Sequence, residues 1–339
     1  MKLDKGIGSY HIETVAPKYS VKTGADSIVV EFGSEVKGKV FLITGVSPNE
    51  LGSFSAEALA KGSPQLLILA SRDTAKAQAV AESIQTINGV VETRLLQLDL
   101  GSFASVRKAA QEVNAYAENI DVLVNNAGIM AVPYSQTEDG LESQLQTNHL
   151  GHFLFTNLIM DKILASGPTS RVVNVSSQGY RIGGVRYFDY NFHDGESYDP
   201  WFAYGASKTM NILHARELAR RLGSRGLTAV SLSPGVIYTN LSTNGARDKF
   251  GDLWALYRKL GDPLGWATPK PLDPNRGVAN HACAALAPDV KNFNGSFILS
   301  LERLPEPVED MSPWAVGELE GMECWELSEK LVGQKFDLK

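Results

Sequence analysis

Short, largely apolar runs recur along this chain, and a stretch able to form a helix follows most of them. A run that is apolar at nearly every position is typical of a strand buried on both faces, because a strand with one wet face alternates polar and apolar residues. Such strands separated by helices predict a parallel sheet covered on both sides. The runs are VFLIT (40–44), LLILA (66–70), RLLQL (94–98), DVLV (121–124), RVVNV (171–175), TAVSLS (228–233) and SFILS (296–300).

The segments between these runs favour helix through their content of Ala, Gln, Glu and Lys. Ser102 can cap one of them, because its hydroxyl can accept a free backbone N–H of the first turn. Seven β-α units in a row predict an α/β fold with a doubly wound, Rossmann-type sheet of seven parallel strands. The expected helices are 52–61, 74–87, 102–118, 138–165, 203–222 and 275–287.

The length of 339 residues by itself suggests about two domains. All seven predicted strands nevertheless lie between residues 38 and 300, and none is left over for a second sheet. We therefore expect one α/β domain with additions around it. These are an N-terminal arm (1–37), a loop (about 180–202), a lid over the substrate (about 236–273) and a tail (301–339) with a final helix near 325–332.

Composition excludes several classes of protein. Lys and Arg number 32 against 38 for Asp and Glu, so the net charge of −6 argues against binding nucleic acid. The two cysteines, Cys283 and Cys324, fit a reducing compartment and exclude a disulfide framework. The longest apolar runs have about five residues, whereas a membrane span needs about 20, and the N-terminus is polar. We expect a soluble, cytoplasmic protein.

A glycine-containing turn joins the first strand to the first helix. Its sequence is Thr-Gly-Val-Ser-Pro-Asn-Glu-Leu-Gly, from Thr44 to Gly52. A strand, a tight turn and a helix N-terminus together form a site for pyrophosphate, because free N–H groups and the helix dipole face the same point. The turn therefore predicts a dinucleotide cofactor.

The residue at the end of the second strand indicates which dinucleotide. Arg72 lies about 20 residues after Gly52, where an acidic residue would hold the 2′-hydroxyl of NAD and an arginine the 2′-phosphate of NADP. No acidic residue ends this strand, so we expect NADP(H). Because Asp73 is adjacent, Arg72 could instead be an ordinary surface residue. Asp99, at the end of the third strand, suits a contact to adenine and equally suits a turn.

Further motifs follow the later strands in a fixed order. They are Asn-Asn-Ala-Gly (125–128), Asn-Val-Ser-Ser (174–177), Tyr-Gly-Ala-Ser-Lys (204–208), and Pro234-Gly235 with Thr239. On these motifs the chain resembles the short-chain dehydrogenase/reductase family over about residues 38–300. The gap from Ser177 to Tyr204 is longer than is usual there. With the long tail, it is similar to the retinol-dehydrogenase-like or WW-domain-oxidoreductase-like branch, which includes reductases of fungal secondary metabolism.

Physical chemistry alone pairs Tyr204 with Lys208. A spacing of four places both on one helix face, and a nearby ammonium would lower the pKa of the phenol from about 10. Such a tyrosine can exchange a proton with a carbonyl or alcohol oxygen. Ser177, at the end of a strand, can hold the same oxygen. Ser176 is the neighbour most easily confused with it.

The resemblance implies a role for each of these residues. Tyr204 would be the general acid or base, Lys208 would lower its pKa and bind the nicotinamide ribose, and Ser177 would orient the substrate oxygen. Asn148 would anchor a water that relays protons to Lys208. Cofactor contacts are implied for Gly45, Ser47, Asn49, Leu51, Gly52, Arg72, Asp99, Leu100, Asn126, Ala127, Gly128, Tyr204, Lys208, Pro234, Gly235, Val236 and Thr239.

The chain departs from the family at two positions of the turn. The related branch usually has glycine where this chain has Asn49 and Glu50. Asparagine can adopt a left-handed conformation, but the carboxylate of Glu50 would lie near two phosphates. We therefore expect Glu50 to weaken cofactor binding.

Other side chains offer weaker signals. His149 and His152 could ligate a metal, yet no cluster of cysteines or carboxylates completes a site, so we expect no metal. Arg216, Arg220, Arg221 and Arg225 predict a solvated helix face. Large apolar side chains after the strand ends suit an apolar, aromatic or polycyclic substrate. They are Met130, Tyr180, Trp201, Phe202, Tyr238, Trp254, Tyr257 and Trp266.

Three functions fit these observations. The first is an NADPH-dependent reductase of ketones or aldehydes, or an alcohol dehydrogenase acting in reverse. The second is a cofactor-dependent isomerisation or cyclisation without net redox change, and the third is a dinucleotide-binding protein without turnover. The complete Ser, Tyr and Lys set favours the first. The family resemblance also implies a homodimer or homotetramer formed through long helices, one of whose interfaces the tail could block.

Overall fold

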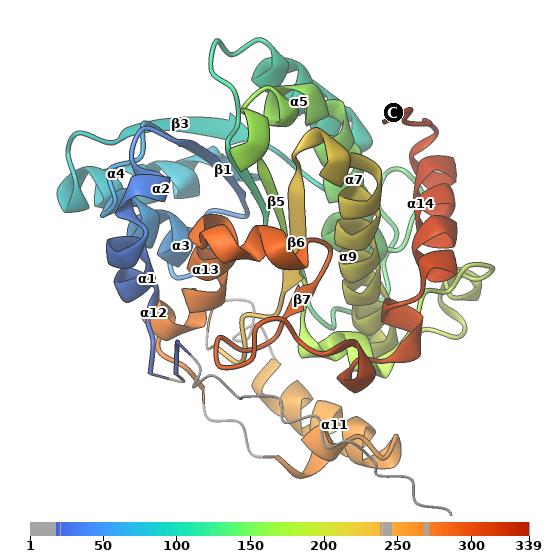
Figure 1. Ribbon diagram of the computed structural model, residues 1–339. Helices are drawn as coiled ribbons and strands as arrows, with labels where there is room; N and C mark the ends of the chain where they lie inside the picture. Colours follow the sequence, from blue (N-terminus) through green and yellow to red (C-terminus); the bar gives the residue numbers. More distant parts are fainter. Residues whose placement is uncertain (1–17, 21, 238, 240–245, 268–270, 339) are drawn as a thin grey trace, which may run out of the picture.

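The computed structural model describes residues 18–20, 22–237, 239, 246–267 and 271–338. For residues 246–250 it describes the backbone alone. Its centre is one parallel sheet with strand order β3-β2-β1-β4-β5-β6-β7 (Figure 1). The predicted doubly wound sheet is therefore confirmed. The strands are β1 (Val40–Thr44), β2 (Leu66–Ser71), β3 (Glu92–Gln97), β4 (Val122–Asn125), β5 (Arg171–Val175), β6 (Thr228–Leu232) and β7 (Phe297–Ile298).

Burial explains why the strands read as continuous apolar runs. Every residue of β1, β2, β5 and β6 is buried. Strand β3 forms an edge of the sheet and is largely accessible, which fits its more polar sequence. The strand order reverses between β1 and β4, and the crevice at such a reversal is where doubly wound sheets bind their ligands.

Two helical layers enclose the sheet (Figure 1). One core lies beneath the first layer and includes Ile28, Leu59, Val80 and Cys283. The helices on that side are α1 (Ala25–Glu31), α2 (Gly33–Val36), α3 (Leu51–Ala60), α4 (Thr74–Ile87), α12 (Pro274–Gly277) and α13 (Ala279–Leu286). Helix α1, from the expected N-terminal arm, packs on α13 and buries Ile28 and Val29.

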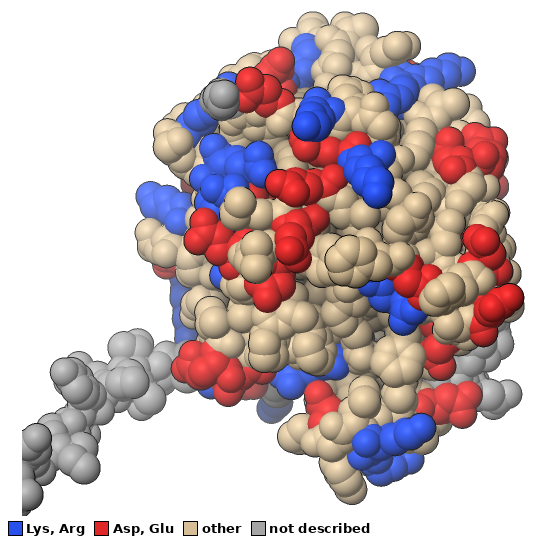
Figure 2. Space-filling model, turned by 90° about the vertical axis from the view of Figure 1, so that its right-hand side faces the viewer, with Lys and Arg blue, Asp and Glu red and all other residues tan. Residues whose placement is uncertain are grey.

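The second layer covers the opposite face and encloses a core that includes Val106, Phe153, Leu213 and Trp325. Its helices are α5 (Phe103–Asn114), α6 (Ser143–Leu145), α7 (Gly151–Leu158), α8 (Met160–Leu164), α9 (Pro200–Leu222) and the tail helix α14 (Glu318–Val332). Acidic and basic side chains are interspersed on the face that carries α14 (Figure 2).

Several helices differ from the sequence expectations: helix 275–287 is divided into α12 and α13, and the tail helix begins at Glu318 rather than near 325. The expected helix 138–165 is divided into α6, a π-helical turn (Gln146–Leu150), α7 and α8. The expected helix 102–118 ends at Asn114. Helix α9 begins at Pro200, three residues early, because Asp199 accepts the N–H groups of Trp201 and Phe202 and proline is well suited to a first turn.

The arginines expected to form a solvated helix face do so only in part, because Arg220 and Arg225 are exposed whereas the tail contacts Arg216 and Arg221. Arg216 donates to the carbonyl of Val316 in the tail, at 2.7 Å. Arg220 and Arg221 both donate to the buried carboxylate of Glu217. The guanidinium of Arg221 also lies 4.2 Å from the ring centroid of Trp325. The spacing of the arginines could not reveal this cover, because the tail that contacts Arg216 and Arg221 lies about 100 residues further along the chain.

Candidate active site

The turn between β1 and α3 requires its glycines. Gly45 has a φ of +74°, and a Cβ there would lie 2.7 Å from the Cα of Ala127. A Cβ on Gly52 would lie 2.5 Å from the carbonyl oxygen of Gly45. The backbone of the turn is thus pressed against the end of β4. The resulting narrow cradle at the N-terminus of α3 fits a dinucleotide, and the half-buried Ser47 and Leu51 lie within it.

The two positions that are not glycine behave differently from each other. Asn49 adopts the left-handed conformation that its side chain tolerates, with a φ of +61°. Glu50 has an extended backbone with a φ of −119°, which any residue can adopt. The hydroxyl of Ser53 accepts the N–H of Glu50 at 3.3 Å and donates to its carbonyl at 2.8 Å. Glu50 therefore begins α3 without backbone strain.

The end of β2 presents an available cation. Asp73, the neighbour that could have neutralised Arg72, instead accepts the N–H groups of Ala75 and Lys76 at the start of α4. Arg72 is exposed, and its guanidinium has no hydrogen bond or ion pair within the described part of the chain. An exposed arginine without an internal partner fits both alternatives, an ordinary surface residue and a contact to a 2′-phosphate.

The ends of β3 and β4 supply the other side of the crevice. Asp99 accepts the N–H of Gly101 at 2.9 Å and is half-buried, while Leu100 is buried. Asn126 donates its side-chain amide to the carbonyl of Thr44, but its buried side-chain oxygen has no partner among the described residues. An unpartnered acceptor at this position fits a ligand that donates hydrogen bonds.

Sequence reasoning missed the organising role of Thr44. Its hydroxyl oxygen accepts the N–H groups of Asn126 and Ala127, at 2.9 and 3.0 Å. It is also hydrogen-bonded to His152 at 2.8 Å. His152 therefore connects α7 to β1. The described residues contain no group of three or more candidate metal ligands around it or elsewhere. The position of Thr44 directly before Gly45 was the available signal.

The structure brings Asn148 and Lys208 together at Gly128. A Cβ on Gly128 would lie 3.0 Å from the side-chain oxygen of Asn148 and 3.4 Å from Nζ of Lys208. Asn148 lies in the π-helical turn, a feature that often occurs at functional sites. Its amide donates to the carbonyl of Ile129 and to the hydroxyl of Ser207, both at 3.0 Å. Lys208 donates to the carbonyl of Val175 at 3.1 Å.

Ser177 and Tyr204 meet on the other side of the same crevice. Ser177 follows β5, and its hydroxyl lies near Tyr204: a Cβ on Gly179 would be 3.4 Å from Ser177 Oγ and 2.9 Å from Cε1 of Tyr204. It also accepts the N–H of Gly179 at 3.0 Å. Ser176, in contrast, is buried and donates to the carbonyl of Lys208 at 2.7 Å. Of the two serines, Ser177 is the one whose hydroxyl lies near the tyrosine ring.

The pKa of Tyr204 differs from the sequence expectation. Burial raises it to about 12, and the nearby hydroxyl of Ser177 opposes part of that rise. Burial also lowers the pKa of Lys208 to about 8. The expected lowering of the tyrosine pKa by the ammonium is absent, because desolvation of the phenolate is the largest effect on this group. Tyr204 is therefore a neutral phenol at neutral pH.

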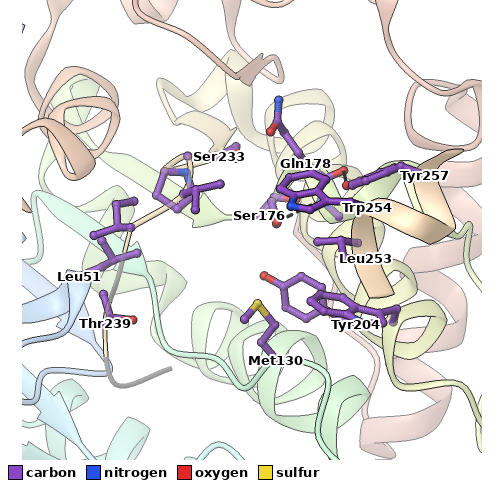
Figure 3. A pocket seen from close by; sticks show the side chains of 17 residues that line it. Leu51, Met130, Ser176, Gln178, Tyr204, Ser233, Thr239, Leu253, Trp254 and Tyr257 are labelled. Atoms are coloured by element: carbon purple, nitrogen blue, oxygen red, sulfur yellow. Dashed lines mark hydrogen bonds between the residues drawn. The ribbon is translucent and has the colours of Figure 1, made fainter. Parts of the chain in front are cut away.

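A largely apolar pocket opens beside Tyr204 (Figure 3). Leu51 and Thr239 line one side, whereas Leu253, Trp254 and Tyr257 of α11 (Ala246–Lys259) line the other. No Lys, Arg, Asp, Glu or His lines it among the described residues. The expected cofactor residues Pro234, Gly235 and Val236, with the buried Thr239, form its wall after β6.

The aromatic candidates divide between pocket and core. Met130, Trp201, Trp254 and Tyr257 line the pocket, and Phe202 packs against the cluster around it. Tyr180 is instead fully buried against Phe297 and Met311. Trp266 is 66% exposed and outside the pocket, and Tyr238 lies outside the described residues.

Comparison with known proteins supports the family that the sequence motifs suggested. A family model described as short chain dehydrogenase matches residues 39–191. Human retinol dehydrogenase 14 is 35% identical over 309 residues, which cover 87% of each chain. The chain belongs to the short-chain dehydrogenase/reductase family. It is therefore an oxidoreductase acting on CH–OH and C=O groups.

Other relatives support the same branch and fold. Human retinol dehydrogenase 13 is 35% identical over 300 residues, covering 88% of this chain and 86% of its own. These similarities confirm the retinol-dehydrogenase-like branch. Among solved structures, an uncharacterised protein of Mycobacterium paratuberculosis is 33% identical with a TM-score of 0.64, covering 89% of this chain and 96% of its own.

A more distant structure shares the fold alone. The 3-ketoacyl-(acyl-carrier-protein) reductase of Brucella melitensis, solved with NADH, is 23% identical with a TM-score of 0.55. It covers 78% of this chain and 97% of its own. As for membranes, none of the described helices is both long enough and apolar enough to cross one.

Proposed function

We propose that this protein is an NADPH-dependent reductase of ketones or aldehydes attached to an apolar group, with Tyr204 as the proton donor. The observation that carries the proposal is the convergence of Ser177 and Tyr204 beside an apolar pocket, with Asn148 and Lys208 next to the glycine-lined crevice. When bound there, the dinucleotide supplies the hydride.

The cradle formed by Gly45, Gly52 and Gly128 would hold the cofactor, and Lys208 would bind its nicotinamide ribose. Asp99, Leu100 and Asn126 would contact the adenosine half. Pro234, Gly235, Val236 and Thr239 would contact the nicotinamide half. A 2′-phosphate would meet Arg72, whose side chain has no competing ion pair among the described residues. This availability supports NADPH over NADH.

The proton chemistry follows from the state of Tyr204. A phenol with a pKa of about 12 is protonated at neutral pH, which is the form that a proton donor to a carbonyl oxygen requires. Ser177 would donate a hydrogen bond to the same oxygen as negative charge develops on it. After donation, Lys208 and a water held by Asn148 would return a proton to the phenolate. The resting protonation state thus favours reduction over oxidation.

Two features of the pocket support the substrate class. Its lining contains aromatic, aliphatic and neutral polar side chains, so a charged group placed there would lose hydration without gaining a partner. Trp254 and Tyr257 are stacked with ring centroids 5.7 Å apart, which offers a flat wall. We therefore favour an uncharged, flat carbonyl compound.

Substitution of one catalytic group tests the proposal. With NADPH and a panel of apolar aromatic ketones and aldehydes, Tyr204→Phe should lower kcat at least a hundredfold, because general acid catalysis contributes about 10²- to 10⁴-fold. The NADPH dissociation constant should change less than threefold. Tyr116→Phe, in the half-buried turn after α5, is the matched control. Undiminished turnover by Tyr204→Phe would overturn the assignment, and product formed without NADPH consumption would indicate the isomerase or cyclase alternative.

A further inference from the structure

The turn that carries Ser177 depends on contacts beyond its own strand. Ser177 Oγ accepts the N–H of Gly179, and this bond fixes the direction of the hydroxyl. Gly179 in turn lies against the ring of Tyr204, since a Cβ there would be 2.9 Å from Cε1 of that ring. A shift of the Gln178–Gly179 peptide would therefore move the serine hydroxyl relative to the tyrosine.

Tyr257 of α11 reaches this peptide from the lid. Its hydroxyl donates to the carbonyl of Gln178 at 3.0 Å, although the two residues are 79 positions apart. Tyr257 is only 1% exposed, so few waters are available to replace that bond. A second link is the ion pair between Arg181 and Asp262, at 3.6 Å. The lid is thus fastened to the turn that holds the serine.

The same tyrosine faces the substrate pocket. Its ring stacks on Trp254 and forms part of the apolar wall (Figure 3). A substrate that contacts this wall therefore presses on a side chain whose hydroxyl holds Gln178. Tyr257 is placed to couple the position of the lid to the direction of the Ser177 hydroxyl.

We propose that Tyr257 is a positioning residue, which aligns Ser177 for the reaction through its hydrogen bond to the Gln178 carbonyl. The inference rests on the proposed reductase function, in which Ser177 contacts the substrate oxygen. Tyr257 itself transfers no proton in this scheme. Its hydroxyl holds the backbone carbonyl of Gln178, and its ring lines the substrate pocket.

Tyr257→Phe removes the hydroxyl and keeps the ring. In the full chain, kcat should fall about fivefold, as expected for the loss of one hydrogen bond, with KM changed less than twofold. In a Ser177→Ala background the same substitution should cause no further loss, because the group it positions is gone. An equal loss in both backgrounds, or no loss in either, would overturn the inference.

Hydrogen exchange supplies a test that needs no turnover. In Tyr257→Phe, amide exchange over residues 177–182 should accelerate about fivefold, while exchange in β1 and β4 stays unchanged. Tyr187→Phe is the matched control, because Tyr187 also donates to a backbone carbonyl, that of Glu320 at 3.1 Å. Unchanged exchange over 177–182 would refute the positioning role. Inactivity of the unmodified protein would instead count against the reductase function alone, so the two failures are distinguishable.

Discussion

The ammonium of Lys208 lies 5.6 Å from the ring centroid of Tyr204, one helical turn away on α9. Both side chains are buried, at 3% and 6% exposure. Burial works against the charged form of each, so it raises the pKa of the phenol and lowers that of the amine. At neutral pH the pair is therefore a neutral phenol beside an ammonium, which is the charge state suited to donating a proton.

This charge state predicts how the rate depends on pH. Reduction should be nearly constant from pH 6 to 7.5 and should decline above about pH 8, as Lys208 loses its proton. Oxidation of the alcohol product should rise with pH over the same range, because Tyr204 must first lose its proton to accept another. Initial rates measured in both directions with saturating cofactor check the prediction. A reductive rate that increases up to pH 9 would contradict it.

Arg72 predicts the choice of cofactor. Arg72→Ser should raise the NADPH dissociation constant about tenfold or more and leave the NADH dissociation constant within twofold. The reason is that only NADPH carries a 2′-phosphate for the guanidinium to bind. Titration of cofactor fluorescence measures both constants. Lys76→Ser, in the first turn of α4, is the control for general loss of positive charge. Equal weakening of both cofactors would refute the role.

We expect the carboxylate of Glu50 to weaken the binding of NADPH relative to the same turn without that charge. Glu50→Gly should tighten NADPH binding several-fold, since a carboxylate at the N-terminus of α3 opposes the phosphates. Glu50→Gln keeps the length of the side chain and its bonded backbone, so it separates charge from flexibility. Both variants should bind more tightly if charge is the cause. An unchanged or weaker dissociation constant in both would contradict the prediction.

Buried histidines predict acid sensitivity of the fold. Burial lowers the pKa of His149 to about 4 and those of His152 and His281 to about 3. Below the unfolded value near 6.5 the unfolded chain therefore binds more protons than the folded one. Stability should be full above pH 6.5 and should fall by on the order of a few kcal/mol as the pH drops to about 4.

A single substitution can isolate part of this effect. Neither ring nitrogen of His281 has a hydrogen-bond partner within the described part of the chain. His281→Leu should thus preserve the fold and reduce the loss of stability between pH 6.5 and 4, measured by urea denaturation. If His281→Leu leaves the change of stability between pH 6.5 and 4 unaltered, protonation of this buried histidine is not a cause of the acid sensitivity.

The sequence predicted the backbone of the site well where a local pattern determines it. All the apolar runs became strands because burial on both faces requires continuous apolar side chains, as in β1 and β2. The turn at Gly45 was predictable because only small or left-handed residues fit there. The start of α9 was missed by three residues, since Asp199 and Pro200 were not recognised as a helix start. The π-helical turn that holds Asn148 has no comparable sequence signal.

By itself, the sequence determined the order of the strands along the chain and the family, and it selected the candidate reacting side chains, because each depends on short motifs. Only the tertiary structure decided which distant groups meet. It brought Tyr257 to Gln178, placed the tail against Arg216 and Arg221, and separated the buried Tyr180 from the aromatics of the pocket. It also decided that burial dominates the pKa of Tyr204. Such contacts join segments up to about 100 residues apart, and desolvation depends on everything packed around a group, so neither can be derived from a local pattern.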